Sequence, residues 1–226
     1  MPVGSRRLRR PLATNRLHPP ATARLVPSRL RIGVLGGSFN PAHDGHRHIS
    51  TEALKQLGLD WVWWLVSPQN PLKSSRDTAP LAVRVARARN VARHPRILVT
   101  DLEARLGTRY TAETLPRLVI RHPRHRFVWL MGADNLATLH HWHRWPDILQ
   151  SVPVAVFDRE PYVLGALAGR AARRFAVARF DTEDLRSLVT AAPPAWGFVR
   201  LRPHPAASSA IRAAGAWGAP ARTEER

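Results

Sequence analysis

An eleven-residue string near the N-terminus concentrates residue types that can bind phosphate. It reads Gly36-Gly37-Ser38-Phe39-Asn40-Pro41-Ala42-His43-Asp44-Gly45-His46. Two adjacent glycines let the backbone approach a ligand closely. Because His43 and His46 are three positions apart at the start of an expected helix, both side chains can project to the same side. The positive end of that helix and its unpaired N–H groups favour a phosphate group.

Other chemistries fit this string poorly. The dinucleotide-binding pattern G-x-G-x-x-G and the P-loop pattern G-x-x-x-x-G-K-[ST] are both absent. A zinc site needs more ligands than the two histidines, and no Asp or Glu is spaced convincingly as a third. The chain has no cysteine, which excludes a thiolate nucleophile, a disulfide framework and a cysteine zinc site.

The elements that must position the string alternate along the chain. Residues 30–35 are predicted as a buried strand and 44–57 as the helix after the turn. Further strands are expected at 61–66, 97–101, 127–131, 152–157 and 196–201, and further helices at 81–93, 112–120, 134–139, 146–149 and from 208. This order predicts an α/β fold with a doubly wound, mostly parallel sheet and helices on both faces. Ligands of such sheets bind at the carboxyl ends of the strands, where the string lies.

Composition divides the chain of 226 residues into one domain and two tails. Residues 1–29 are predicted to be a basic, disordered tail, 30–218 the domain, and 219–226 a frayed end. Seven of the charges behind the net charge of +19 are arginines among the first 30 residues, which contain no acidic residue. No apolar run approaches the roughly 20 residues of a membrane span. Residues 160–195 are expected to form a surface helix and loops, and the arginines of helix 81–93 to be solvated.

The string resembles the H-x-G-H signature of the nucleotidyltransferase superfamily. More closely, G-G-S-F-N-P-x-H-x-G-H is similar to the signature of bacterial nicotinate-nucleotide adenylyltransferases. The resemblance implies that the turn and both histidines hold the phosphates of ATP, with His46 nearest the α-phosphate. It also implies catalytic roles for His43 and His46, and an acceptor-side role for Asn40. The other residues of the turn expected to bind ATP are Gly36, Gly37, Ser38 and Phe39.

A second segment, Ala207-Ser208-Ser209-Ala210-Ile211-Arg212, resembles the family pattern S-S-T-x-I-R. Two hydroxyls, a helix N-terminus and a guanidinium can cradle the β- and γ-phosphates. The resemblance therefore implies that Ser208, Ser209 and Arg212 bind ATP and that Arg212 assists catalysis. Ala207 replaces the first serine of the pattern, which removes one hydroxyl.

Three further segments resemble the family in the same order along the chain. Gly132 and Asp134 match G-A-D-x-L, where Asp134 either binds a ribose or caps the next helix. Lys73 matches a loop lysine that meets the triphosphate. On the acceptor side, Thr111 lies in a Y-T-x-x-T-L match and either borders the nicotinate or caps a helix, while Trp142 can stack on a pyridine ring.

The implied reaction is adenylyl transfer from ATP to nicotinate mononucleotide, which gives nicotinate adenine dinucleotide and pyrophosphate for NAD biosynthesis. The attacking phosphate monoester is already anionic, so alignment and charge screening matter more than a general base. Mg²⁺ is expected to arrive with ATP, without a metal site of the protein. The resemblance implies a cytoplasmic enzyme whose partners are the two nucleotides, with no membrane and no specific nucleic acid.

Three alternatives remain open at this stage. The fold can serve another phosphate ester, such as nicotinamide mononucleotide or phosphopantetheine. The positive charge can instead belong to a nucleic-acid-binding protein, which would bind RNA or DNA with a steep salt dependence. Ala207 raises the third alternative, a degenerate relative without catalysis, against which the retained His43, His46 and Arg212 argue.

Overall fold

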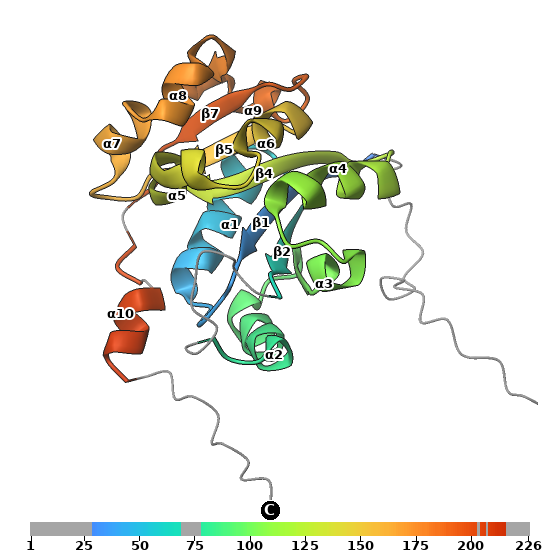
Figure 1. Cartoon of the computed structure of the whole chain (residues 1–226), viewed down its shortest axis with the longest axis vertical. Coiled ribbons are helices and arrows are strands. Elements are labelled where there is room, and N and C mark those ends of the chain that lie inside the picture. Colours follow the sequence, from blue (N-terminus) through green and yellow to red (C-terminus); the bar gives the residue numbers. More distant parts are fainter. Residues whose placement is uncertain (1–28, 69–77, 203, 207, 216–226) are drawn as a thin grey trace, which may run out of the picture.

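The computed structural model describes residues 29–68, 78–202, 204–206 and 208–215. In this part of the chain the centre is a seven-stranded sheet with the order β3-β2-β1-β4-β5-β7-β6, and every neighbouring pair is parallel (Figure 1). The strands are β1 (Arg31–Gly37), β2 (Trp61–Val66), β3 (Ile97–Thr100), β4 (Arg126–Gly132), β5 (Val154–Phe157), β6 (Arg179–Phe180) and β7 (Trp196–Val199). The predicted doubly wound α/β fold is confirmed.

Helices cover both faces of the sheet because its strands are apolar on both sides. They are α1 (Asp44–Gln56), α2 (Leu81–Ala92), α3 (Leu102–Leu106), α4 (Thr111–Arg121), α5 (Ala133–Thr138), α6 (Trp145–Ser151), α7 (Val163–Leu167), α8 (Arg170–Arg174), α9 (Leu185–Leu188) and α10 (Ser208–Ala213). Short 3-10 turns lie at Leu139–His141, Ala176–Ala178 and Thr182–Asp184.

The two faces have separate hydrophobic cores. Trp129 in β4 and Leu115 in α4 belong to the first core, which also takes residues from α3 and α5 to α8. Leu130, the next residue of β4, belongs to the second core with Ala53 of α1 and residues of α2 and α9. Successive residues of one strand thus face opposite sides, as the period of two requires. The order of strands reverses between β1 and β4, and this switch point is the expected ligand crevice.

One region was predicted wrongly. Residues 160–195, expected as a surface helix and loops, contain α7, α8, α9 and the strand β6. β6 has two residues, which pair with Trp196 and Gly197 of β7. A strand this short has no periodicity of its own, so only its pairing with β7 defines it. The short helix α3 was also missed.

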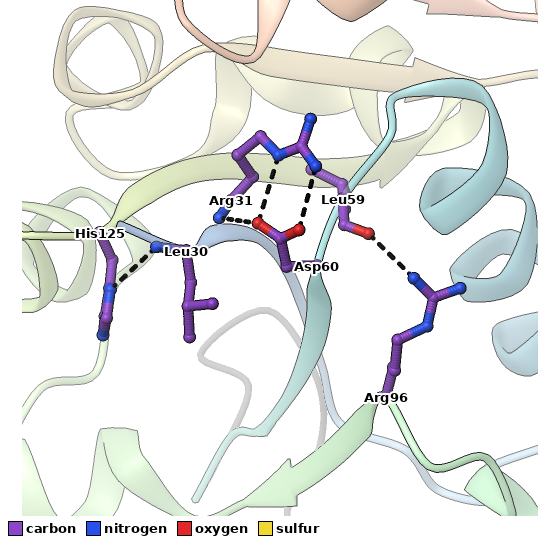
Figure 2. Close-up of polar contacts among 6 residues, drawn as sticks. All are labelled: Leu30, Arg31, Leu59, Asp60, Arg96 and His125. Atoms are coloured by element: carbon purple, nitrogen blue, oxygen red, sulfur yellow. Dashed lines mark hydrogen bonds and ion pairs between the residues drawn. The ribbon is translucent and has the colours of Figure 1, made fainter. Parts of the chain in front are cut away.

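The amino edge of the sheet is fixed by polar contacts shown in Figure 2. The backbone N–H of Arg31 donates to Asp60 at 2.7 Å, and the Arg31 guanidinium meets the same carboxylate at 3.0 Å. The N–H of Leu30 donates to Nδ1 of His125 at 3.4 Å, and Arg96 donates to the carbonyl of Leu59 at 3.4 Å. These contacts tie the start of β1 to the residue before β2 and to the loop before β4, and they tie the segment before β3 to the segment before β2.

Several predictions fall on residues outside this description. These are the basic tail apart from Arg29, the C-terminal end at 219–226, Lys73 and Ala207. No helix of the described ranges has the length and hydropathy needed to cross a bilayer.

Candidate active site

The string at residues 36–46, called the signature turn from here on, lies at the carboxyl end of β1 and beside the switch point. Gly36 and Gly37 are the last two residues of β1, so the strand extends into what was expected to be the turn. A Cβ at Gly36 would collide with the Trp129 ring, which makes that glycine necessary for packing. At Gly37 the nearest atom to such a Cβ would be in the Phe39 ring, 3.5 Å away. Gly37 is therefore the glycine whose surroundings still allow close approach of a ligand.

Phe39 anchors the turn in the second core. Its φ is 46°, in the left-handed region that a bulky residue adopts only when its surroundings enforce it. The ring is buried and stacks on Trp64 with centroids 5.0 Å apart. The Trp64 indole N–H in turn donates to the Ser50 hydroxyl at 2.7 Å. The Phe39 side chain thus belongs to the core, which leaves its backbone for any contact with ATP.

The two histidines of the signature lie together at the start of α1. Their ring centroids are 3.9 Å apart, and the backbone N–H of His43 donates to Nδ1 of His46 at 3.2 Å. Because Nδ1 of His46 accepts, the neutral ring carries its proton on Nε2. Burial, together with the charges of Arg159 and His204 and against the opposing effect of Asp44, lowers the pKa of His43 to about 4. His43 is therefore neutral at pH 7, and its buried Nδ1 has no hydrogen-bond partner among the described residues.

The second signature docks directly on the first. In α10 the Ser208 hydroxyl donates to the carbonyl of Pro41 at 2.9 Å, and the Arg212 guanidinium donates to that of Asn40 at 2.6 Å. Ser209, the neighbouring hydroxyl, is exposed. The fold thus brings together two segments separated by more than 160 residues, as a common phosphate site requires.

The ends of β4 and β5 add a carboxylate and an arginine to this edge. Gly132 is the N-cap of α5 and Asp134 is its second residue, so the capping alternative for Asp134 is wrong. One oxygen of Asp134 accepts from Arg159 at 2.9 Å, while the buried Oδ1 has no partner among the described residues. Arg159 was missed by the sequence analysis. Arg159 lies two residues after the strand Val154–Phe157, and this position beyond the carboxyl end of a strand was the signal that could have identified it.

Two residues predicted to bind the acceptor lie at the start of α4 and directly after the 3-10 turn Leu139–His141. Tyr110 is the N-cap of α4 and Thr111 its first residue, so Thr111 does not cap the helix as the alternative proposed. The rings of Tyr110 and His143 lie 4.3 Å apart. Since their chain neighbours are Thr111 and Trp142, this contact brings the two predicted acceptor residues into one region. Trp142 is half-buried against the first core.

A buried carboxyl, that of Glu103, connects α3 to α4. The Thr114 hydroxyl lies 3.3 Å from Oε1 of Glu103 and 2.8 Å from the Thr108 hydroxyl. Burial raises the pKa of Glu103 to about 7, against the opposing effect of the Thr114 contact. This network joins α3 to α4 and holds the segment that carries Thr111. Only tertiary burial distinguishes Glu103 from an ordinary helical glutamate, so no local pattern could have predicted its role.

Asn40 is buried, and its Oδ1 accepts from the backbone N–H of Ala79 at 3.2 Å. This contact ties the turn to the segment before α2. If Asn40 contacts an acceptor nucleotide, its side chain does so while its Oδ1 also accepts the hydrogen bond from Ala79.

Comparisons with known proteins agree with this geometry. A family profile described as cytidylyltransferase-like matches residues 34–214. A protein of Cereibacter sphaeroides (strain ATCC 17025), named a probable nicotinate-nucleotide adenylyltransferase, is 56% identical over 186 residues, which are 82% of this chain and 98% of that protein. A protein of Parvibaculum lavamentivorans with the same name is 49% identical over 197 residues, which are 87% of this chain and 98% of that protein.

A solved structure shares the fold at low identity. It is the Plasmodium falciparum nicotinic acid mononucleotide adenylyltransferase in complex with NaAD, with a TM-score of 0.60 and 16% identity over 80% of this chain and 82% of that one. At this identity the likeness concerns the fold alone. The profile match and the identities near 50%, over nearly the full length of the relatives, show the family. The chain belongs to the nicotinate-nucleotide adenylyltransferases.

Proposed function

We propose that the protein transfers the adenylyl group of ATP to nicotinate mononucleotide, releasing pyrophosphate and forming nicotinate adenine dinucleotide. The observation that carries the proposal is the docking of Ser208 and Arg212 on the turn that holds His43 and His46. Hydroxyl, guanidinium and imidazole groups thereby converge at the carboxyl ends of the strands, where nucleotides bind in such sheets. Family membership supports the same reaction.

In the proposed reaction the 5′-phosphate of the acceptor attacks the α-phosphorus of ATP. A bond forms between the acceptor oxygen and the α-phosphorus, and the bond to the β-phosphate oxygen breaks, with the electron pair leaving on pyrophosphate. The proton on Nε2 of His46 provides a hydrogen bond for an α-phosphate oxygen as charge develops there. No residue has to accept a proton, because the nucleophile is already ionised.

Arg212 and Ser208 serve the leaving pyrophosphate in this proposal. Both now donate to carbonyls of the turn, and a phosphate oxygen is a stronger acceptor because the bond is charge-assisted. Mg²⁺ would enter on the ATP oxygens and screen the charge of the triphosphate. Among the described residues no group of three or more His, Asp or Glu side chains is placed to hold a metal ion.

The acceptor site is proposed to comprise Thr111 and Trp142, with the Trp142 ring stacking on the pyridine ring. Asp134 suits a ribose, since its buried Oδ1 is an acceptor without a described partner and ribose hydroxyls donate. Lys73, outside the described residues, completes the ATP side by resemblance. A cytoplasmic location, where ATP is available, belongs to the same proposal.

The test is an acceptor panel. The purified protein is incubated with Mg²⁺ and ATP together with nicotinate mononucleotide, nicotinamide mononucleotide or phosphopantetheine, and pyrophosphate release is measured. The proposal expects the highest kcat/KM with nicotinate mononucleotide. Faster release with another acceptor would reassign the substrate. Release with none of them, together with salt-dependent binding of RNA or DNA, would favour the nucleic-acid alternative.

A further inference from the structure

Arg84 is a buried arginine directly behind the signature turn. It lies in the first turn of α2, and only 1% of its surface is exposed. The expectation that the arginines of this helix are solvated is therefore wrong for Arg84. A fully buried arginine is rare unless its charge has a defined partner.

Its guanidinium donates to four backbone carbonyls. Nε donates to Ala79 at 2.7 Å, Nη1 to both Ser38 and Ser67 at 2.7 Å, and Nη2 to Pro68 at 2.8 Å. These carbonyls belong to three segments: the signature turn, the chain after β2 and the chain before α2. One side chain thus joins the turn to both flanks of the connection between β2 and α2.

Ala79 provides a second link between Arg84 and the signature turn, because both of its backbone polar groups form hydrogen bonds. Its carbonyl accepts from Arg84, while its N–H donates to the Asn40 side chain. Ser38 and Asn40 are therefore both fixed through Ala79 and Arg84. The α10 contact from Arg212 reaches the Asn40 carbonyl from a different part of the chain.

The charge of Arg84 has no acidic counterpart in the described part of the chain, where all ion pairs involve other residues. Carbonyl dipoles solvate the guanidinium but do not neutralise it. Burial correspondingly lowers its pKa, although an arginine stays protonated at neutral pH. The signature turn that it contacts is the segment expected to receive the triphosphate, which has the opposite charge.

We propose that Arg84 is a positioning residue for the ATP side of adenylyl transfer. It fixes the Ser38 carbonyl and with it the conformation of the turn, and its buried charge favours binding of an anion on the other side of that turn. Arg84 acts through the turn and does not touch the reacting atoms. The inference takes ATP as the substrate from the proposed function. The experiment below also measures ATP binding in the absence of an acceptor, so the two proposals can fail separately.

The experiment compares Arg84→Lys and Arg84→Met with two control variants from the same helix. Arg89→Met removes an exposed arginine, and Val85→Ala shortens a buried side chain of α2 while Arg84 and its four hydrogen bonds remain. The affinity for Mg-ATP is measured by calorimetry, followed by kcat and both KM values. Circular dichroism confirms that each variant is folded.

We expect Arg84→Met to weaken Mg-ATP binding by about ten- to a hundredfold, the effect of losing a charge-assisted hydrogen-bond network. The KM for nicotinate mononucleotide should change much less than the affinity for Mg-ATP, because Asn40 is linked to Arg84 only indirectly, through Ala79, and no described hydrogen bond joins Thr111 or Trp142 to Arg84. Arg84→Lys keeps the charge but not the four-way geometry, so it should recover part of the affinity. Arg89→Met should behave as the wild type.

An ATP affinity of folded Arg84→Lys and Arg84→Met equal to that of Val85→Ala would overturn the inference and leave Arg84 a structural residue. If Arg84→Met does not fold, the Mg-ATP affinity of Arg84→Lys and a measurement on the wild type still test the proposal. In the wild type, Mg-ATP should shift the nuclear magnetic resonance signal of the Arg84 Nε–H, and an unchanged signal contradicts the proposal. A wild type that binds ATP but releases no pyrophosphate with any acceptor rejects the proposed function separately.

Discussion

At the amino edge of the sheet an arginine meets a carboxylate, whereas at the carboxyl edge two arginines meet backbone carbonyls. Arg31 pairs with Asp60 at 3.0 Å in a half-exposed ion pair (Figure 2). Within the described residues, Arg84 and Arg212 donate to carbonyls of the signature turn and its neighbours and form no ion pair. The first arrangement cancels charge, while the second retains a positive charge beside the turn.

Under the proposed function, the difference distinguishes an ion pair that joins the starts of two strands from arginines whose uncancelled charge favours an anion at the signature turn. A half-exposed ion pair contributes little to stability, because water already solvates both partners. A cation bonded to neutral carbonyls keeps its full charge, and this charge attracts a triphosphate electrostatically. The Arg159–Asp134 pair is intermediate, since one carboxylate oxygen remains without a partner in the described chain.

The largest effect is expected from His46→Ala at the carboxyl edge. Loss of the imidazole donor removes stabilisation of the α-phosphate in the transition state, so kcat should fall by about 100- to 1,000-fold. The variant should retain its circular dichroism spectrum. His94→Ala, which changes a histidine beyond the end of α2, is the control and should keep kcat. Near-normal turnover in folded His46→Ala would contradict the assigned role.

The second-largest effect is expected on the pH dependence of stability, through Glu103. This buried carboxyl forms no ion pair among the described residues. Its pKa rises from 4.5 to about 7 on folding, so the folded state binds the proton more tightly between these values. Stability from this group is therefore complete below pH 4.5 and is lost as the pH rises through 7, by roughly 3 kcal/mol. In Glu103→Gln this part of the decline should disappear in urea titrations at pH 5 to 8.5. Glu113→Gln is the control, and a decline in Glu103→Gln as steep as in wild type would contradict the account.

A smaller effect is expected from Trp142→Ala on the acceptor side. Loss of a stacked ring should raise the KM for nicotinate mononucleotide by about tenfold. The affinity for Mg-ATP should stay unchanged, because no described hydrogen bond links Trp142 to Ser208, Arg212 or Arg84. Steady-state kinetics with each substrate varied in turn measures both values. An equal rise in both KM values would mean that Trp142 supports the whole edge.

The smallest effect is expected at the amino edge from Asp60→Asn. The asparagine side chain still accepts from the backbone N–H of Arg31, and the lost pair has exposed fractions of 46% and 29%. The free energy of unfolding should fall by at most about 1 kcal/mol, with kcat unchanged. Denaturant titration and the pyrophosphate assay measure these quantities. A large loss of activity would remove the distinction between the two edges.

The sequence predicted the parts of this site that depend on local pattern. The first strand, its turn and helix α1 follow from periodicity and glycine spacing, and α1 at Asp44–Gln56 differs from the expected 44–57 by one residue. The family was predicted correctly from short motifs, as the profile match and the relatives at 56% and 49% identity together confirm. The roles of individual site residues stay predictions.

Features that depend on distant contacts were missed. Arg84 looks like any arginine of a basic helix, and only its four bonds to three segments reveal a different role. β6 exists because β7 lies beside it. The capping alternatives for Thr111 and Asp134 were wrong because each helix begins before or at the residue in question.

The most direct test follows the α-phosphate itself. The protein is given Mg²⁺, nicotinate mononucleotide and ATP labelled at the α-phosphorus, and the labelled products are separated over time. Direct transfer predicts that the label appears in nicotinate adenine dinucleotide in equal amounts with pyrophosphate, and only when the acceptor is present. Label that remains on the protein, or that accumulates as AMP without the acceptor, would contradict the account.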